Sequence, residues 1–219
     1  MAKRRTFVVV GLGTFGATVA SELKRFGNSV IGIDIDERLV SNMAEQLDQA
    51  LILDAKDENA MREAGVGDAD VGVIAVASDL EASVLTAVNL KMLGVPTVWA
   101  KATTKRHHRI LAKLGVDRVI HPEEEIGYAV AQFLHNPLIR DYAALGNGYH
   151  VVNFTVPKKL EGKRLPDLDL MKRHEVRPIG VMRGTDWLGA ADCSRELALD
   201  DRLILLGTRA NLRAFAETL

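Results

Sequence analysis

The stretch Phe7-Val8-Val9-Val10-Gly11-Leu12-Gly13-Thr14-Phe15-Gly16 decides the fold of this chain. A helix-like run follows it as far as Phe26, then a second apolar run from Val30 to Ile33, and then Asp34. This order of strand, glycine turn, helix, strand and acid is typical of a unit that binds nucleotide phosphates at the N-terminus of its helix. A glycine-rich turn without a ligand is the alternative, and the surrounding pattern argues against it.

Each glycine of the turn has its own physical task. Gly11 permits the tight turn off the strand, Gly13 lets the backbone approach a pyrophosphate, and Gly16 lets the helix pack closely on the sheet. Asp34 follows Gly16 by 18 residues. At this spacing a carboxylate accepts hydrogen bonds from ribose hydroxyls and repels a 2′-phosphate.

The bulk composition indicates a soluble globular protein of one domain or two small ones. The chain has 219 residues, of which 47% are hydrophobic and 26% charged, enough to bury a full core. A net charge of −1 gives no electrostatic reason to expect nucleic acid or an anionic membrane as the main partner. The single Cys193 excludes an internal disulfide framework and a cysteine zinc cluster. We therefore expect a cytoplasmic protein.

Beyond the first unit, short β-rich runs alternate with helical periodicity, which predicts a parallel sheet covered by helices on both faces. The further strands are expected at 50–53, 71–77, 97–101 and 117–120. Six strands with intervening helices predict a doubly wound, Rossmann-like α/β fold with its ligand across the carboxyl ends of the strands.

Two of the intervening helices are expected to face the core through stripes of large apolar residues, namely Leu39, Met43 and Leu47, and then Leu80, Val84, Val88 and Met92. Asp57 is a predicted N-cap, and Ser78-Asp79-Leu80-Glu81 fits a capping box. A helix over 104–114 is expected between the last two strands.

A helix over 122–135 closes the N-terminal domain, which we place at 1–136. It begins at Pro122 and carries Ile126, Val130, Phe133 and Leu134 on one face. The mixed, glycine-bounded segment 137–149 is expected to be a linker. A small α+β domain follows over 150–219, with a hairpin turn at 183–186 and a closing helix.

The residues that follow the strands are expected to line one nucleotide crevice: Asp34, Asp54-Ala55, Ala77-Ser78 and Lys101. Helix capping alone would also explain Ser78.

The charged residues near the crevice have two possible roles each. Lys101 either lays its stem along the strand end or holds a phosphate by its charge. The acids Glu123-Glu124-Glu125 either complement the helix dipole or bind a hard cation. No histidine has metal-ligand spacing to another.

We expect no enzyme. Tyr128, Tyr142 and Tyr149 are followed four residues later by Gln, Gly and Asn, so the Tyr-x-x-x-Lys pair of a large class of dehydrogenases is absent. There is also no large second domain to hold a substrate. The crevice is suited to bind a nucleotide as a signal and not as a substrate.

The chain resembles the cytosolic RCK regulators of potassium transport, and among them the KtrA/TrkA-type subunits. The matching residues are V-V-G-L-G-T-F-G at Val9 to Gly16, I-D-I-D-E at Ile33 to Glu37, V-W-A-K-A at Val98 to Ala102, and L-G-V-D-R-V-I-H-P-E at Leu114 to Glu123. The C-terminal domain matches as well, so the resemblance covers essentially the whole chain.

The resemblance implies a nucleotide-sensing subunit that forms dimers and then an octameric ring at the inner face of the plasma membrane, under a KtrB/TrkH-like potassium transport subunit. It assigns the phosphates to Gly11, Gly13, Phe15, Gly16 and Lys101, the ribose to Asp34, and the rim of the base pocket to Asp54, Ala55, Ala77 and Ser78. Thr14 and Ile35 are also expected to belong to the nucleotide site. It also implies that Glu123 helps place a divalent cation, Mg²⁺ or Ca²⁺, between two nucleotide sites of a dimer, and that helix 122–135 joins neighbouring protomers. In some relatives the C-terminal domain binds a cyclic dinucleotide.

The chain departs from this pattern at Thr14, because KtrA-like proteins usually carry arginine after the second glycine. A neutral hydroxyl cannot replace a guanidinium fork at a triphosphate. The resemblance implies ATP or ADP as the ligand, and NAD(H) and AMP-like ligands stay open. A small NAD(P)-dependent oxidoreductase and a standalone nucleotide or redox sensor are the alternative functions.

Overall fold

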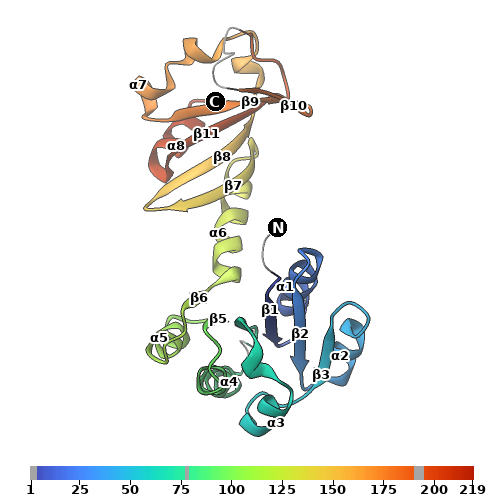
Figure 1. The fold of residues 1–219 in the computed structure, drawn as a ribbon. Coiled ribbons are helices and arrows are strands. Elements are labelled where there is room, and N and C mark those ends of the chain that lie inside the picture. Colours follow the sequence, from blue (N-terminus) through green and yellow to red (C-terminus); the bar gives the residue numbers. More distant parts are fainter. Residues whose placement is uncertain (1–3, 77–78, 190–194) are drawn as a thin grey trace. The chain divides into compact units, whose positions relative to one another are not determined.

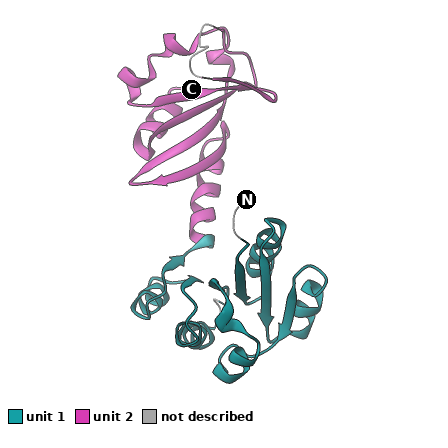
Figure 2. Ribbon diagram, in the orientation of Figure 1, with its two compact units in different colours: residues 1–123 teal, residues 124–219 magenta. Residues whose placement is uncertain are grey.

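A computed structural model describes residues 4–76, 79–189 and 195–219, so the expectations on Ala77, Ser78 and Cys193 lie outside the described residues. The chain divides into two compact units, Met1–Glu123 and Glu124–Leu219 (Figure 2). This division falls in the first turn of helix α6 (Pro122–His135), whereas the sequence pattern places the whole helix in the first domain.

The first unit is a doubly wound α/β domain, as the sequence predicts (Figure 1). All strand pairs are parallel and their order is β3-β2-β1-β4-β5-β6. The strands are β1 (Thr6–Val10), β2 (Ser29–Asp34), β3 (Gln49–Ile52), β4 (Val71–Ile74), β5 (Thr97–Lys101) and β6 (Arg118–Ile120). The order reverses between β1 and β4, which is where ligands bind in sheets of this kind.

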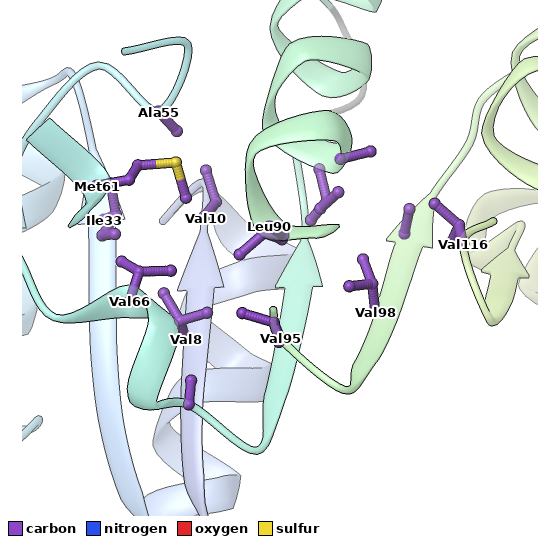
Figure 3. Packing of buried hydrophobic residues seen from close by; sticks show 14 of the residues in the cluster. Val8, Val10, Ile33, Ala55, Met61, Val66, Leu90, Val95, Val98 and Val116 are labelled. Carbon is purple, nitrogen blue, oxygen red and sulfur yellow. The ribbon is translucent and has the colours of Figure 1, made fainter. Parts of the chain in front are cut away.

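Helices cover both faces because successive residues of each strand point to opposite sides. Val8 and Val10 pack in one core with Met61 and Leu90 (Figure 3), whereas Val9 packs in a second core with the helices that follow β1 and β2. The helices are α1 (Thr14–Arg25), α2 (Glu37–Met43), α3 (Glu58–Glu63), α4 (Leu80–Met92) and α5 (Lys105–Lys113).

Helix α4 does not pack through the predicted stripe. Leu80 and Met92 are exposed, and the buried face is formed instead by Ser83, Thr86, Ala87, Asn89 and Leu90. Small side chains allow the helix to lie close to the sheet, where Leu90 fills the space above Gly72. The prediction failed because it counted large apolar residues, whereas a close contact between helix and sheet selects small ones.

Two smaller differences concern helix ends. Helix α2 ends at Met43, so the buried Leu47 packs from the turn beyond it and not from the helix. Asp79 is the N-cap of α4, with its side chain accepting from the Ala82 N–H at 3.0 Å. The predicted cap at Asp57 is confirmed, because its carboxylate accepts from the N–H groups of Asn59 and Ala60.

The second unit is an antiparallel sheet of order β10-β9-β11-β8-β7 with short helices, which matches the expected α+β class. Its elements after α6 are β7 (Ile139–Gly146), β8 (Tyr149–Thr155), α7 (Leu170–His174), β9 (Arg177–Arg183), β10 (Asp186–Gly189), β11 (Arg202–Thr208) and α8 (Arg209–Ala216). The hairpin turn predicted at 183–186 joins β9 to β10. The core contains Phe154 and Phe215, whose rings meet edge to face at 5.8 Å.

The segment 137–149 is not a linker. It contains β7, which pairs with β8 through a turn in which Gly146, Asn147 and Gly148 all have positive φ. The glycines therefore mark a tight hairpin and not a flexible connection. The strand escaped prediction because it lies at the edge of the sheet and is mostly exposed, with Ile139 and Tyr142 as its contacts to the core. Without a buried face, a strand shows no alternation of apolar and polar residues.

Among the residues described, helices of the length and apolarity that a membrane crossing needs are absent.

The buried carboxylate of Asp201 is expected to stabilise the second unit. Arg183 donates to both of its oxygens, at 2.8 and 2.7 Å, and the Ala198 N–H donates at 2.8 Å. We expect Asp201→Ala to lower the free energy of unfolding of this unit by about 2 kcal/mol, because the guanidinium and the N–H lose their acceptor. The matched control is Asp167→Ala in the exposed pair with Arg164, which should cost less than about 1 kcal/mol. Calorimetry of the full chain measures both, and equal losses would contradict the assignment.

The same carboxyl predicts the pH dependence of this unit. Burial raises the pKa of Asp201, but the hydrogen bonds from Arg183 and the Ala198 N–H outweigh it and hold the pKa below its usual range. The stabilisation is therefore complete above the unfolded pKa of about 3.9 and is lost as the pH falls through the folded value. The melting temperature of wild type should drop more steeply below about pH 4 than that of Asp201→Ala.

Candidate functional site

The glycine turn between β1 and α1 is fixed by contacts that leave no room for side chains. Gly11 has a φ of +94° and donates its N–H to the Ile33 carbonyl at 2.8 Å. A Cβ on Gly16 would lie 1.8 Å from the Gly11 carbonyl oxygen, so the start of α1 touches the turn itself. Gly13 is different, because a Cβ there would meet nothing within 4 Å. Gly11 and Gly16 are thus needed for the fold, while Gly13 leaves space beside the backbone.

Asp34 holds the turn from the end of β2. One carboxylate oxygen accepts from the Leu12 N–H at 2.7 Å and the other from the Asp36 N–H at 2.9 Å. The carboxylate is half-buried, and each oxygen has a second lone pair for a further donor. Asp34 therefore orients the glycine turn and still presents acceptors to a ligand hydroxyl.

Two hollows lie at the carboxyl ends of the strands and share Gly13 and Ala75. The first has a volume of about 350 Å³ and includes residues that follow β1, β2 and β3 together with one wall of α4. The second, of about 530 Å³, lies at the N-terminus of α1 and extends to the end of β5. Together they form a crevice whose two parts meet at the glycine turn.

Every predicted site residue that the structure describes lines this crevice. The first hollow is lined by Gly11, Gly13, Asp34, Ile35, Asp54 and Ala55, and the second by Gly13, Thr14, Phe15, Gly16, Lys101 and Glu123. Residues from five separate parts of the chain are thus brought together by the parallel sheet. The structure therefore shows where these residues lie. Their contacts with a ligand remain a prediction.

Lys101 and Glu123 form an ion pair at the far end of the second hollow. The Lys101 side chain is only 13% exposed, and its ammonium lies 5.6 Å from the centre of the Phe15 ring. Its hydrogen bond to Glu123 lowers the pKa of that carboxyl below the usual range. Lys101, which is expected to bind a phosphate, and Glu123, which is expected to help place a cation, are therefore each other's partners in the structure.

Helix α4 contributes residues that the sequence pattern did not single out. The Asn89 amide donates to the carbonyls of Ala55 and Lys56 at 2.9 and 3.0 Å and so fixes the loop after β3. Thr86 lines the first hollow, and its buried hydroxyl has no partner within the described part of the chain. A sequence pattern could have identified this face of the helix: the polar residues Ser83, Thr86 and Asn89 recur at every third position beside Ala87 and Leu90.

The buried His107 has a structural partner in the same region. Its Nε2 lies 2.9 Å from the Ser83 hydroxyl, and burial lowers its pKa. It joins α5 to α4 and does not face the crevice residues named above. Within residues 4–76, 79–189 and 195–219, no three side chains of His, Cys, Asp or Glu gather as a metal group would require.

The crevice has the chemistry of a nucleotide site. Free N–H groups at the start of α1 and a glycine with open space suit a phosphate, and the apolar first hollow with Asp34 at its edge suits a base and ribose. The residues present thus fit a nucleotide. For a divalent cation, the chain itself supplies one carboxylate, Glu123, which is paired with Lys101.

Comparison with known families assigns both units. The TrkA-N domain matches residues 7–122, and the TrkA-C domain matches residues 150–219. The Ktr system potassium uptake protein A of Vibrio alginolyticus is 35% identical over 208 residues, which cover 95% of this chain and 94% of that protein. The Bacillus subtilis (strain 168) protein of the same name is 30% identical over 213 residues, or 97% of this chain and 96% of that protein.

Among solved structures, the GsuK channel bound to NAD has the same fold, with a TM-score of 0.67 and 14% identity over 97% of this chain and 39% of that one.

The glycine turn yields a matched pair of variants. We expect Gly16→Ala to lower the free energy of unfolding of the first unit by at least about 2 kcal/mol, because the new methyl group collides with the Gly11 carbonyl. Gly13→Ala should change it by less than about 0.5 kcal/mol, because the site is open and its φ of −62° suits alanine. Urea unfolding followed by tryptophan fluorescence measures both, with Trp187→Phe in each protein so that Trp99 of β5 gives the signal. Equal stability of the two variants would show that the close contact is not needed.

Proposed function

Since the chain belongs to the family of proteins built from a TrkA-N and a TrkA-C domain, we propose that it is the nucleotide-binding regulatory subunit of a Ktr-type potassium uptake system. It is a regulatory protein and not an enzyme. The observation that carries the proposal is the match of both domains, in the same order, to potassium uptake proteins over nearly the full length of each chain.

The nucleotide is proposed to lie along the crevice. Its phosphates would meet the N–H groups at the start of α1 beside Gly13, its ribose would donate to Asp34, and its base would enter the hollow lined by Ile35, Asp54 and Ala55. Thr14 presents a neutral hydroxyl where a terminal phosphate would lie, which weakens any preference for ATP over ADP. The GsuK structure bound to NAD keeps NAD(H) among the candidates, and a redox sensor is the second reading of the same site.

A nucleotide phosphate at the end of the second hollow would compete with Glu123 for Lys101. The carboxylate of Glu123, which is 65% exposed, would then be free to bind Mg²⁺ or Ca²⁺, which prefer oxygen ligands. The remaining ligands would come from phosphate, water and a second copy of the chain. In this proposal the ion pair is exchanged when nucleotide and cation bind together.

Helix α6 is proposed to join two copies of the chain. None of its residues is buried, and Ile126, Val130 and Leu134 are 64%, 44% and 79% exposed. Two such helices in antiparallel contact would cover these residues and bring the acids of one N-terminus towards His135 of the other. Dimers of this kind are proposed to build an octameric ring at the cytoplasmic face of a KtrB/TrkH-like membrane subunit.

Regulation is proposed to be a shift of population between ring shapes. A nucleotide that binds one shape of the dimer more tightly than another favours that shape, and the membrane subunit responds to it. A ligand with equal affinity for both shapes would regulate nothing. Small-angle scattering profiles that are identical without ligand, with ATP and with ADP would contradict this mechanism.

The ligand is tested by thermal unfolding against ATP, ADP, AMP, NAD⁺ and NADH, each with and without Mg²⁺. A ligand that binds only the native state stabilises it by about 2.7 kcal/mol at a hundredfold excess over its dissociation constant, so a true ligand is visible. We expect a shift with ADP or ATP that Mg²⁺ increases in wild type. The Mg²⁺ increment should vanish in Glu123→Gln, since an amide is a poor ligand for a hard cation.

Gly13→Ala serves as the binding variant in this experiment, because it adds one methyl group to the open side of the turn without a clash. We expect its nucleotide affinity to fall at least tenfold, about 1.4 kcal/mol, while its own melting temperature stays near that of wild type. Unchanged affinity would place the phosphates elsewhere.

In the wild-type chain, a rise of the melting temperature with NADH alone would favour the redox sensor.

The role in transport is tested in cells that lack their own potassium uptake systems. This chain, expressed together with the Ktr-type membrane subunit of its own genome, should restore growth at low potassium, and the membrane subunit alone or with Gly13→Ala should restore it poorly. Equal growth with and without the chain would overturn the proposed function even if nucleotide binding is found.

A further inference from the structure

Two histidines face each other beside the point where the chain leaves the first unit. His108 belongs to α5, and His121 follows β6 directly before Pro122. Nδ1 of His108 lies 2.9 Å from Nε2 of His121, and the two rings are parallel within 6° at a centroid distance of 5.2 Å. We propose that this pair is a binding site for a divalent transition-metal ion that accepts right-angled ligands, such as Ni²⁺.

The distance between the facing nitrogens suits two ligands of one ion. Imidazole nitrogens bind ions of this class at about 2.0–2.1 Å, so two neighbouring ligands that meet at a right angle at an octahedral ion such as Ni²⁺ lie about 2.9 Å apart, whereas the tetrahedral angle usual for Zn²⁺ needs about 3.3 Å. The two nitrogens have this separation in the structure. In the hydrogen bond the two nitrogens point at each other, so each ring must turn about its side-chain torsions to direct its lone pair at a common ion.

The protonation of the two rings also allows a metal ion to replace their hydrogen bond. In the hydrogen bond one facing nitrogen carries the proton and the other offers a lone pair. When an ion binds, the bridging proton moves to the outer nitrogen of the same ring, which leaves two neutral imidazoles with both inner lone pairs on the metal. The neutral pair therefore binds the ion without releasing a proton.

The surroundings limit the protein to these two ligands. The neighbouring His107 is turned to the Ser83 hydroxyl, and Glu123 is paired with Lys101. Water completes the coordination, as the part of the chain that the structure describes holds no third ligand in the group. Imidazole favours Ni²⁺, Cu²⁺ and Zn²⁺, whereas Mg²⁺ and Ca²⁺ prefer oxygen. This site thus takes a different class of ion from the cation proposed at Glu123.

A bound ion would tie α5 to the residue that precedes α6. His108 is held by a helix of the first unit, and His121 is the last residue before the helix whose remaining turns belong to the second unit. Replacing a single hydrogen bond by two metal bonds restrains the start of α6. The inference does not depend on which nucleotide the crevice binds.

The test uses the full chain without an affinity tag, since a histidine tag would itself bind the ion. Calorimetric titration with NiCl₂ should show about one site per chain, with a dissociation constant below about 1 mM, as two imidazole ligands allow. We expect at least tenfold weaker binding in His108→Gln and in His121→Gln. The matched control is His135→Gln at the exposed end of α6, which should bind as wild type does.

A crystal of the wild-type chain soaked in NiCl₂ provides a measurement that needs no variant. An anomalous peak between His108 and His121 supports the site. Absence of binding by the wild-type chain, binding that survives in both His108→Gln and His121→Gln, or an anomalous peak confined to other residues would overturn it.

Discussion

The contact between the start of α1 and the glycine turn is the constraint on which the rest of the first unit depends. The Gly16 Cα lies so close to the Gly11 carbonyl that no side chain fits between them. This contact holds the start of α1 against the turn that follows β1 and beside Ala75, which follows β4. Asp34 holds the turn from the opposite side through the Leu12 N–H. The geometry of the crevice follows from these two contacts.

Charge at the far end of the crevice is balanced within the protein. The nearly buried Lys101 would be costly without a partner, and Glu123 supplies one from the first turn of α6. In the function that we propose, an anionic ligand would take over Lys101 and so change the electrostatics at the start of α6.

Two helices of the chain bear apolar residues that their own unit does not cover. Leu80 and Met92 of α4 are exposed because the small side chains on its other face bring it close to the sheet. Ile126, Val130 and Leu134 of α6 are exposed along a helix with no buried residue. Exposed apolar faces of this kind are typical of proteins that associate, in keeping with the assembly that we propose.

The sequence by itself determined the doubly wound order of the strands and the position of the glycine turn. It also determined that Asp34 and other residues that follow strands lie at one edge of the sheet. The reason is that apolar periodicity, glycine conformation and parallel connections follow local or topological rules. It could not determine which face of α4 is buried, since small residues carry that contact, nor identify β7, since an exposed edge strand has no apolar alternation. The pairing of Lys101 with Glu123 and of His108 with His121 joins residues 22 and 13 positions apart. Only the tertiary structure decided these pairs, because spacing along a chain does not specify which side chains meet once separate strands and helices are packed together.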